Sequence, residues 1–154
     1  MDHLNVEAMD LLDAYGISTP VGGLAESATE AEAIARDLGG PVVMKIASPD
    51  ILHKSDIGGV EVGVPVEDVR DTYQAFLDRA AEHDPDASIL GVQVEELVDL
   101  EEETETIVGV NRDPQFGHLL MFGLGGICVQ IFEDTSFRVV PVSERESRAM
   151  TADI

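Results

Sequence analysis

The sequence has almost no lysine, a single cysteine and no long apolar run. One cysteine, Cys128, cannot form an internal disulfide, so cysteine usage gives no sign of an oxidising compartment. The apolar runs are short and interrupted, which predicts no transmembrane helix. The acidic N-terminus also lacks the basic and then apolar order of a signal peptide. Together these absences predict a cytoplasmic protein.

Positive charge is scarce as a class: 9 Lys and Arg residues stand against 31 Asp and Glu, for a formal net charge of −22. Such a chain repels nucleic acid and anionic membranes, so neither is expected as a partner. Two explanations compete, an acidic partner-binding surface and a cytoplasm of very high salt, where screening reaches about 3 Å at 1 M. Because the acids are spread along the chain and arginine outnumbers lysine, we favour a salt-loving (halophilic) organism.

What the sequence does contain is enough apolar surface, 44% of residues, for one domain or two small lobes. The spacing of apolar residues predicts helices over residues 4–15, 27–38, 66–83 and from 143 onward. β-Branched and alternating runs predict strands over residues 41–47, 60–64, 88–98, 105–110 and 118–124, the first and the last of them buried. Ser27 and Glu30 have the spacing of a capping box. The fold class expected is therefore α/β (α+β).

Both lysines of the chain, Lys45 and Lys54, fall in one stretch, residues 41–64. Lys45 lies in an apolar strand, where an ammonium is costly to bury unless an anion meets it. The alternative is that its stem reaches to the surface, but in a chain with so few lysines we favour a ligand contact. Gly58 and Gly59 follow in a loop whose backbone N–H groups could receive phosphates, although a Gly-Gly pair can also serve only a tight turn.

His53, between the lysines, has an imidazole that can attack phosphorus in its neutral form, or can simply hydrogen-bond backbone in a loop. A second informative stretch covers residues 111–142. Arg138 is expected in a strand, meeting a phosphate or carboxylate or pairing with Asp134. Three glycines there predict either a sharp turn with close backbone approach to a ligand or mere packing: Gly123, Gly125 and Gly126.

The motifs HKSDIGGV (53–60), RDPQFG (112–117) and FGLGGI (122–127) resemble one family. It is the ATP-grasp subunit, or domain, of the nucleoside-diphosphate-forming acyl-CoA synthetases, best known as ADP-forming acetate–CoA ligase. The resemblance implies an ATP-grasp domain over 1–154, with a complete first lobe over about 17–95 and a partial second lobe over about 96–154. The family's Mg²⁺-holding acid pair and Asn-Pro segment are then expected beyond residue 154.

By resemblance, Lys45 matches a lysine that binds the triphosphate, His53 a histidine that carries phosphate, and Glu105 a glutamate near the nucleotide. Residues 95–98 match the junction that holds adenine, although Glu95 and Glu96 are open to the alternative of two more surface acids. The complete expected nucleotide site is Lys45, Lys54, Gly58, Gly59, Glu95, Glu96, Leu97, Val98, Glu105, Gly125, Gly126 and Arg138, with His53 catalytic. Two positions depart from the family pattern: Gln130 replaces a glutamate, which weakens any Mg²⁺ site, and Glu103 stands where glycine is usual.

The resemblance implies the reaction acetyl-CoA + ADP + phosphate = acetate + CoA + ATP, with phosphate relayed through a histidine. ATP/ADP and Mg²⁺ are the implied cofactors. The implied partner is a CoA-binding alpha subunit or domain that supplies the phosphate through an acyl phosphate, in a hetero-oligomer. An alternative is a catalytically inactive, truncated ATP-grasp fragment that acts as a binding module. A third possibility, an ATP-grasp ligase that works without CoA, is disfavoured by the HKSDIGGV motif.

Overall fold

A computed structural model describes residues 5–51, 53–99, 103–125 and 135–154. The chain divides into two compact units, Met1–Val98 and Asp99–Ile154, which are described separately. In the part of the chain that the structure describes, no helix has the length and apolar character needed to cross a membrane.

The first unit is built on a four-stranded sheet, with the order β1-β4-β2-β3 and antiparallel neighbours throughout. The strands are β1 (Gly22–Ala25), β2 (Val42–Ala47), β3 (Val60–Val64) and β4 (Gly91–Glu96). The predicted strand over 88–98 is therefore shorter than expected. The apolar β2 lies between β4 and β3, and β2 and β3 pair as antiparallel neighbours.

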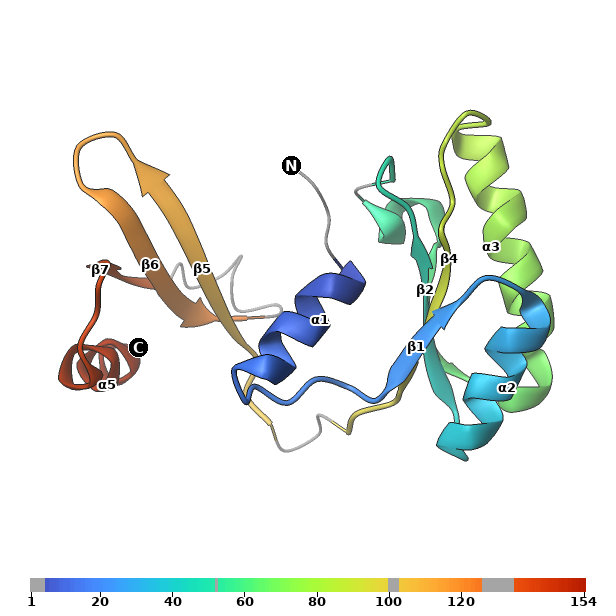
Figure 1. Cartoon of the computed structure of the whole chain (residues 1–154), viewed down its shortest axis with the longest axis horizontal. Coiled ribbons are helices and arrows are strands. Elements are labelled where there is room, and N and C mark those ends of the chain that lie inside the picture. Colours follow the sequence, from blue (N-terminus) through green and yellow to red (C-terminus); the bar gives the residue numbers. More distant parts are fainter. Residues whose placement is uncertain (1–4, 52, 100–102, 126–134) are drawn as a thin grey trace. The chain divides into compact units, whose positions relative to one another are not determined.

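Helices of the first unit are α1 (Asn5–Ala14), α2 (Ala28–Leu38) and α3 (Val69–His83), with a short 3₁₀ helix η2 (Val66–Asp68) before α3. Figure 1 shows α2 and α3 side by side along one face of the sheet. The core lies between these helices and the sheet. Its fully buried larger side chains are Val42, Met44, Ile46, Val69, Phe76, Val92 and Val94.

The capping box at the start of α2 forms only in part. The Ser27 hydroxyl accepts the Glu30 N–H at 3.3 Å, as predicted. The Glu30 carboxylate accepts the N–H of Glu26 at 2.9 Å, whereas a capping box requires the N–H of Ser27. The first turn is still capped, and the return bond is displaced by one residue.

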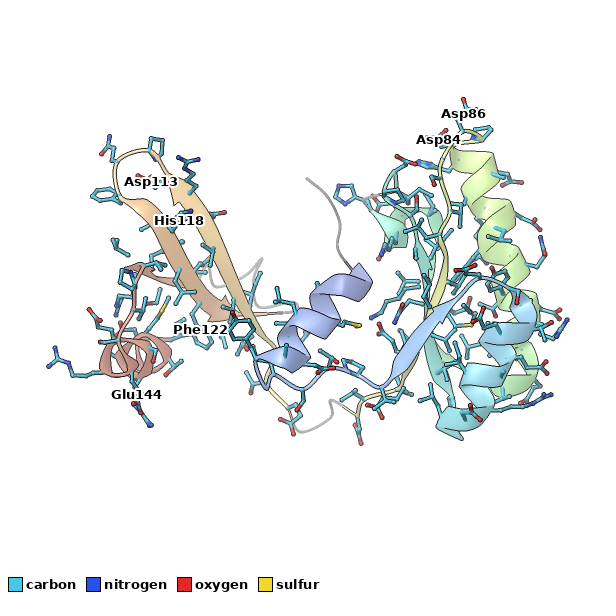
Figure 2. The ribbon with its side chains drawn as sticks, in the orientation of Figure 1. Asp84, Asp86, Asp113, His118, Phe122 and Glu144 are labelled. Carbon is cyan, nitrogen blue, oxygen red and sulfur yellow. The ribbon has the colours of Figure 1, made fainter. Side chains whose placement is uncertain are left out.

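The second unit is a three-stranded antiparallel sheet in the order β5-β6-β7. Its described elements are β5 (Thr106–Asp113), β6 (Gly117–Leu124), β7 (Thr135–Val139) and α5 (Glu144–Ala152). The β5–β6 turn is closed by Asp113, whose carboxylate accepts the N–H groups of Gln115 and Phe116 at 2.8 and 2.9 Å (Figure 2).

Two predictions for the second unit are wrong. Gly123 lies within β6, opposite Ile107 and Thr135, so it is not part of a turn. The strand β6 is not buried either, because Gly123 is its only residue in the buried class. Strand alternation places residues on both faces of the sheet, and α5, the one described helix of this unit, contacts β6 and β7.

Candidate functional site

The sheet of the first unit has one apolar and one polar face. Side chains alternate along a strand, so Met44 and Ile46 point into the core while Lys45, between them, points to the other face. The register places Lys45 opposite Gln93 and Val43 opposite Glu95. Lys45 and Glu95 are thus diagonal neighbours on the face that α2 and α3 leave open.

Lys45 forms an ion pair with Glu95, with 2.6 Å between the ammonium nitrogen and Oε2. The Glu95 side chain is 3% exposed and that of Lys45 38% exposed. The sequence predicted that an anion meets Lys45, and the structure places there a carboxylate of the chain itself. The alternative that Glu95 is another surface acid is wrong, because its side chain is buried beside a cation.

A pocket of about 200 Å³ opens on this polar face. Burial lowers the pKa of Lys54, the neighbouring Lys45 ammonium lowers it further, and the Glu95 carboxylate acts in the opposite direction. In the described residues, the buried Gln93 Oε1 has no hydrogen-bond partner. The pocket therefore brings together two ammonium groups and an unpaired acceptor. Its lining is Met9, Lys45, Ala47, Lys54, Gln93 and Glu95.

The loop after β2 contains a short 3₁₀ helix, η1 (Lys54–Ile57), which ends at Gly58 with φ +63°. The Gly58 N–H donates to Ser55 O at 3.1 Å, and the Gly59 N–H donates to Lys54 O at 2.7 Å. A Cβ on Gly59 would lie 2.7 Å from Ile46 Cγ2. Both N–H groups are engaged within the turn, so the prediction that they receive phosphate does not hold in this arrangement. The tight-turn alternative accounts for both glycines.

Arg79 of α3 holds the end of this loop, and sequence reasoning missed it. Its Nη1 donates to the Gly58 carbonyl at 2.6 Å, and its guanidinium lies 5.9 Å from the centroid of the Phe76 ring. Phe76 is buried in the core. The contact joins residues 21 apart in sequence, and no local pattern marks it.

His53 lies just before η1 and is exposed. Its backbone carbonyl accepts the Asp56 N–H at 3.1 Å. Its side chain has no hydrogen bond or ion pair among the described residues, so the alternative of an imidazole bonded to backbone is not seen there. His53 and His83, the latter at the exposed end of α3 as predicted, line a second pocket of about 290 Å³ together with Asp50, Ile51, Asp56 and Ile57.

The expected adenine junction follows Glu95 directly. The Glu96 carboxylate accepts the Val21 N–H at 2.9 Å, which ties the end of β4 to the segment before β1. Leu97 and Val98 are exposed at 44% and 48%. Their backbone lies at the end of the first unit.

Three of the expected residues lie in the second unit, and a fourth, Gly126, lies outside the described residues together with Gln130 and Asp134. The Gly125 N–H donates to Glu105 O at 2.7 Å, so these two are adjacent. Arg138 lies in β7, as predicted, and pairs with Asp153 of α5 at 2.5 Å. The carboxylate that Arg138 meets is thus, like that of Lys45, supplied by the chain.

A sequence model of the ATP-grasp domain matches residues 3–154. The chain belongs to the ATP-grasp domain family. It is 42% identical, over 149 residues and 96% of its length, to the acetate–CoA ligase [ADP-forming] I subunit beta of Pyrococcus furiosus. This ATP-grasp chain is therefore of the type found in ADP-forming acetate–CoA ligases.

Solved structures give the same assignment for this ATP-grasp chain. Dinucleotide forming acetyl-coenzyme A synthetase 1 of Ca. Korarchaeum cryptofilum, in complex with coenzyme A and Ca-AMPCP, matches 96% of the chain with a TM-score of 0.87 and 42% identity. The same enzyme with coenzyme A and Mg-AMPPCP, its phosphohistidine segment pointing towards the nucleotide binding site, matches 100% with a TM-score of 0.75 and 37% identity. The expected mixed α/β class is confirmed.

The ATP-grasp chain spans 63% of the Pyrococcus furiosus subunit and 64% and 63% of the two solved chains. Its described residues fit the phosphate groups of a nucleotide, because two ammonium groups line one pocket. They do not fit a magnesium site by themselves, since no described group of three or more His, Cys, Asp or Glu side chains could hold a metal ion.

Proposed function

We propose that this chain is the nucleotide-binding part of an ADP-forming acyl-CoA synthetase, and that it passes phosphate between His53 and ADP. The overall reaction would be acetyl-CoA + ADP + phosphate = acetate + CoA + ATP. One observation carries the proposal: Lys45 and Lys54, the only lysines of the chain, line the same pocket. A chain of net charge −22 repels anions as a whole, so a pocket whose lining keeps a charge of +1 after Glu95 is counted is a local exception that suits an anionic ligand.

The two lobes of the ATP-grasp fold are assigned to the two units. The first unit supplies the phosphate pocket, and residues 95–98 supply backbone groups for adenine at the junction. By resemblance to the family, Glu105, Gly125, Gly126 and Arg138 are also proposed as nucleotide-binding residues. A CoA-binding alpha subunit or domain delivers the phosphate from an acyl phosphate.

His53 is assigned as the phosphate carrier by similarity to the Korarchaeum enzyme, whose phosphohistidine segment points towards its nucleotide binding site. Exposure of the imidazole and its freedom from hydrogen bonds among the described residues suit that role. In the transfer, the phosphorus forms a bond to the terminal oxygen of ADP as its bond to the ring nitrogen breaks. That nitrogen takes back the electron pair, while the other ring nitrogen keeps its proton.

The lysines act by stabilising charge on the transferred group. Proteins catalyse phosphoryl transfer mostly by positioning the reacting groups and by stabilising their charge electrostatically. Lys45 and Lys54 would supply both, Lys45 from within the central strand β2 and Lys54 from the first residue of η1. Mg²⁺, when bound, neutralises phosphate charge, and we assign none of its ligands to the described residues.

The test is direct phosphorylation of the chain by [γ-³²P]ATP in the presence of Mg²⁺. The wild-type chain is expected to carry an acid-labile, base-stable label, which His53→Ala abolishes while ADP still binds in calorimetry. His118→Ala, at an exposed histidine of β6, is the matched control and keeps the label. Labelling of His53→Ala at the wild-type level would remove His53 from the mechanism.

A second candidate is an inactive nucleotide-binding module. It is favoured by the lack of a metal-binding cluster among the described residues and by Gln130. It predicts that ADP binds to the chain with measurable heat, whereas no histidine label forms under any Mg²⁺ concentration. The two experiments together separate the candidates.

A further inference from the structure

Among the described residues that line the phosphate pocket, Glu95 is the single acid, and 3% of its side chain is exposed. Burying a carboxylate is unfavourable unless it is paired and hydrogen-bonded. The Lys45 ammonium donates a hydrogen bond of 2.6 Å to the Glu95 carboxylate. The neighbour on the same face of the strand, Gln93, is neutral. The charge at position 95 is therefore a specific feature of the pocket.

The Glu95 carboxylate changes the net charge of the pocket lining and the number of free hydrogen-bond donors on Lys45. Lys45 and Lys54 alone give the lining a charge of +2, and Glu95 reduces it to +1. An ammonium has three donor hydrogens, and the bond to Glu95 Oε2 uses one of those on Lys45. The remaining donors stay available, but any phosphate that approaches them also approaches the carboxylate.

We propose that Glu95 is a positioning residue that fixes the Lys45 ammonium in the pocket and, through its charge, weakens the binding of nucleotide phosphates. The inference rests on the proposed function of the pocket as a phosphate site. Glu95 then has two effects that can be separated. Its carboxylate oxygen orients the Lys45 ammonium, and its negative charge repels the phosphate groups of the nucleotide. A nucleotide that must be exchanged at each turnover would be released more easily from such a pocket.

Two substitutions separate these effects. Glu95→Gln keeps the length of the side chain and an oxygen that can accept from Lys45, but removes the charge. Glu95→Asp keeps the charge and shortens the side chain by one methylene group. Glu61→Gln, at an exposed position of the edge strand β3, is the matched control for loss of one acidic charge from the same sheet.

The binding of ADP is measured by calorimetry at fixed ionic strength. Removal of one negative charge several ångströms from the phosphates is expected to tighten ADP about tenfold in Glu95→Gln. Glu95→Asp and Glu61→Gln are expected to give no tightening. The proposal is overturned if Glu95→Gln binds ADP no more tightly than the wild type, or if Glu95→Asp tightens it equally, because a change in packing would then explain the effect.

A readout without nucleotide keeps the two proposals distinguishable. The chain has two lysines, so labelling with ¹³C-lysine gives two side-chain signals that can be titrated by NMR. The Glu95 carboxylate raises the pKa of Lys54. The pKa of Lys54 is therefore expected to be lower in Glu95→Gln than in the wild type, and to be unchanged in Glu61→Gln. If it falls while no chain binds ADP, the proposed function fails, and with it the effect of Glu95 on nucleotide binding, whereas the effect of its charge on the pKa of Lys54 stands. If ADP binds the wild type but the Lys54 pKa is unmoved, the role of Glu95 fails alone.

Discussion

The two units use antiparallel sheets of similar composition but bury them very differently. In the first unit Val42, Val92 and Val94 are 0% exposed beneath α2 and α3. In the second, Val108 is 66% and Val110 60% exposed, and Met150 of α5 is the largest buried side chain that the structure describes there. A β-branched, alternating sequence therefore predicts a strand. Which side chains of that strand belong to the core depends on the helices that cover one face of the sheet.

The two units also differ in how many hydrogen bonds their cationic side chains make within the protein. In the second unit Arg138 is bonded to Asp153, to Ser136 Oγ at 3.1 Å and to the Phe137 carbonyl at 2.8 Å. In the first unit the Lys45 ammonium donates to one group among the described residues, the Glu95 carboxylate, and keeps donors for a ligand. The comparison assigns both stability and anion binding mainly to the first unit, and three changes test it.

The largest expected effect is on stability. Phe76→Ala removes a fully buried ring and is expected to lower the free energy of unfolding by about 3–5 kcal/mol. Phe116→Ala, at a side chain 62% exposed in the second unit, is expected to change it by about 0.5 kcal/mol or less. Both tyrosines of the chain, Tyr15 and Tyr73, lie in the first unit, so urea titration followed by tyrosine fluorescence reports on that unit. Equal effects of the two substitutions would contradict the division.

An intermediate effect is expected where the loop meets the core. Gly59→Ala places a methyl group 2.7 Å from Ile46 Cγ2 and 3.0 Å from the Lys54 carbonyl, and overpacking of this kind typically costs about 1–3 kcal/mol. Gly109→Ala in β5 meets only the flexible end of Met121, at 3.4 Å. We expect the first change to lower the urea midpoint clearly and the second to leave it nearly unchanged. A Gly59→Ala chain as stable as the wild type would show that the loop is not held against the core.

The smallest expected effect concerns pH. The pKa of Lys54 is lowered, chiefly by burial, so Lys54 loses its charge at a lower pH than an exposed lysine. Because the ammonium is charged below its pKa, ADP affinity is expected to fall as pH rises through that pKa, by about tenfold for the loss of one charge. Lys54→Arg stays charged and should bind ADP with constant affinity over the same range. Calorimetry across alkaline pH measures both, and parallel pH curves would rule out Lys54 as the titrating group.

Much of the fold, and part of the candidate site, could be predicted from the sequence. The helices and most strands follow from periodicity, and the need of Lys45 for an anion follows from the cost of burying a charge. The identity of that anion could not be predicted, because Glu95 is 50 residues away and becomes a neighbour only through the register of β2 with β4. Most of β6 is only half-buried, and this was missed for a related reason. The sequence of a strand does not show which of its faces another element covers. Gly123 was misassigned because glycine in a strand and glycine in a turn look alike in one sequence.

The hold of Arg79 on Gly58 limits how far His53 can travel. Gly58, whose carbonyl is anchored, is the fifth residue after His53, and five residues of fully extended chain span at most about 18 Å. While the 2.6 Å bond to Gly58 persists, the backbone of His53 stays inside a sphere of that radius, centred on a point that Phe76 ties to the core. A phosphate carried on this histidine would be delivered by a short tether of known length.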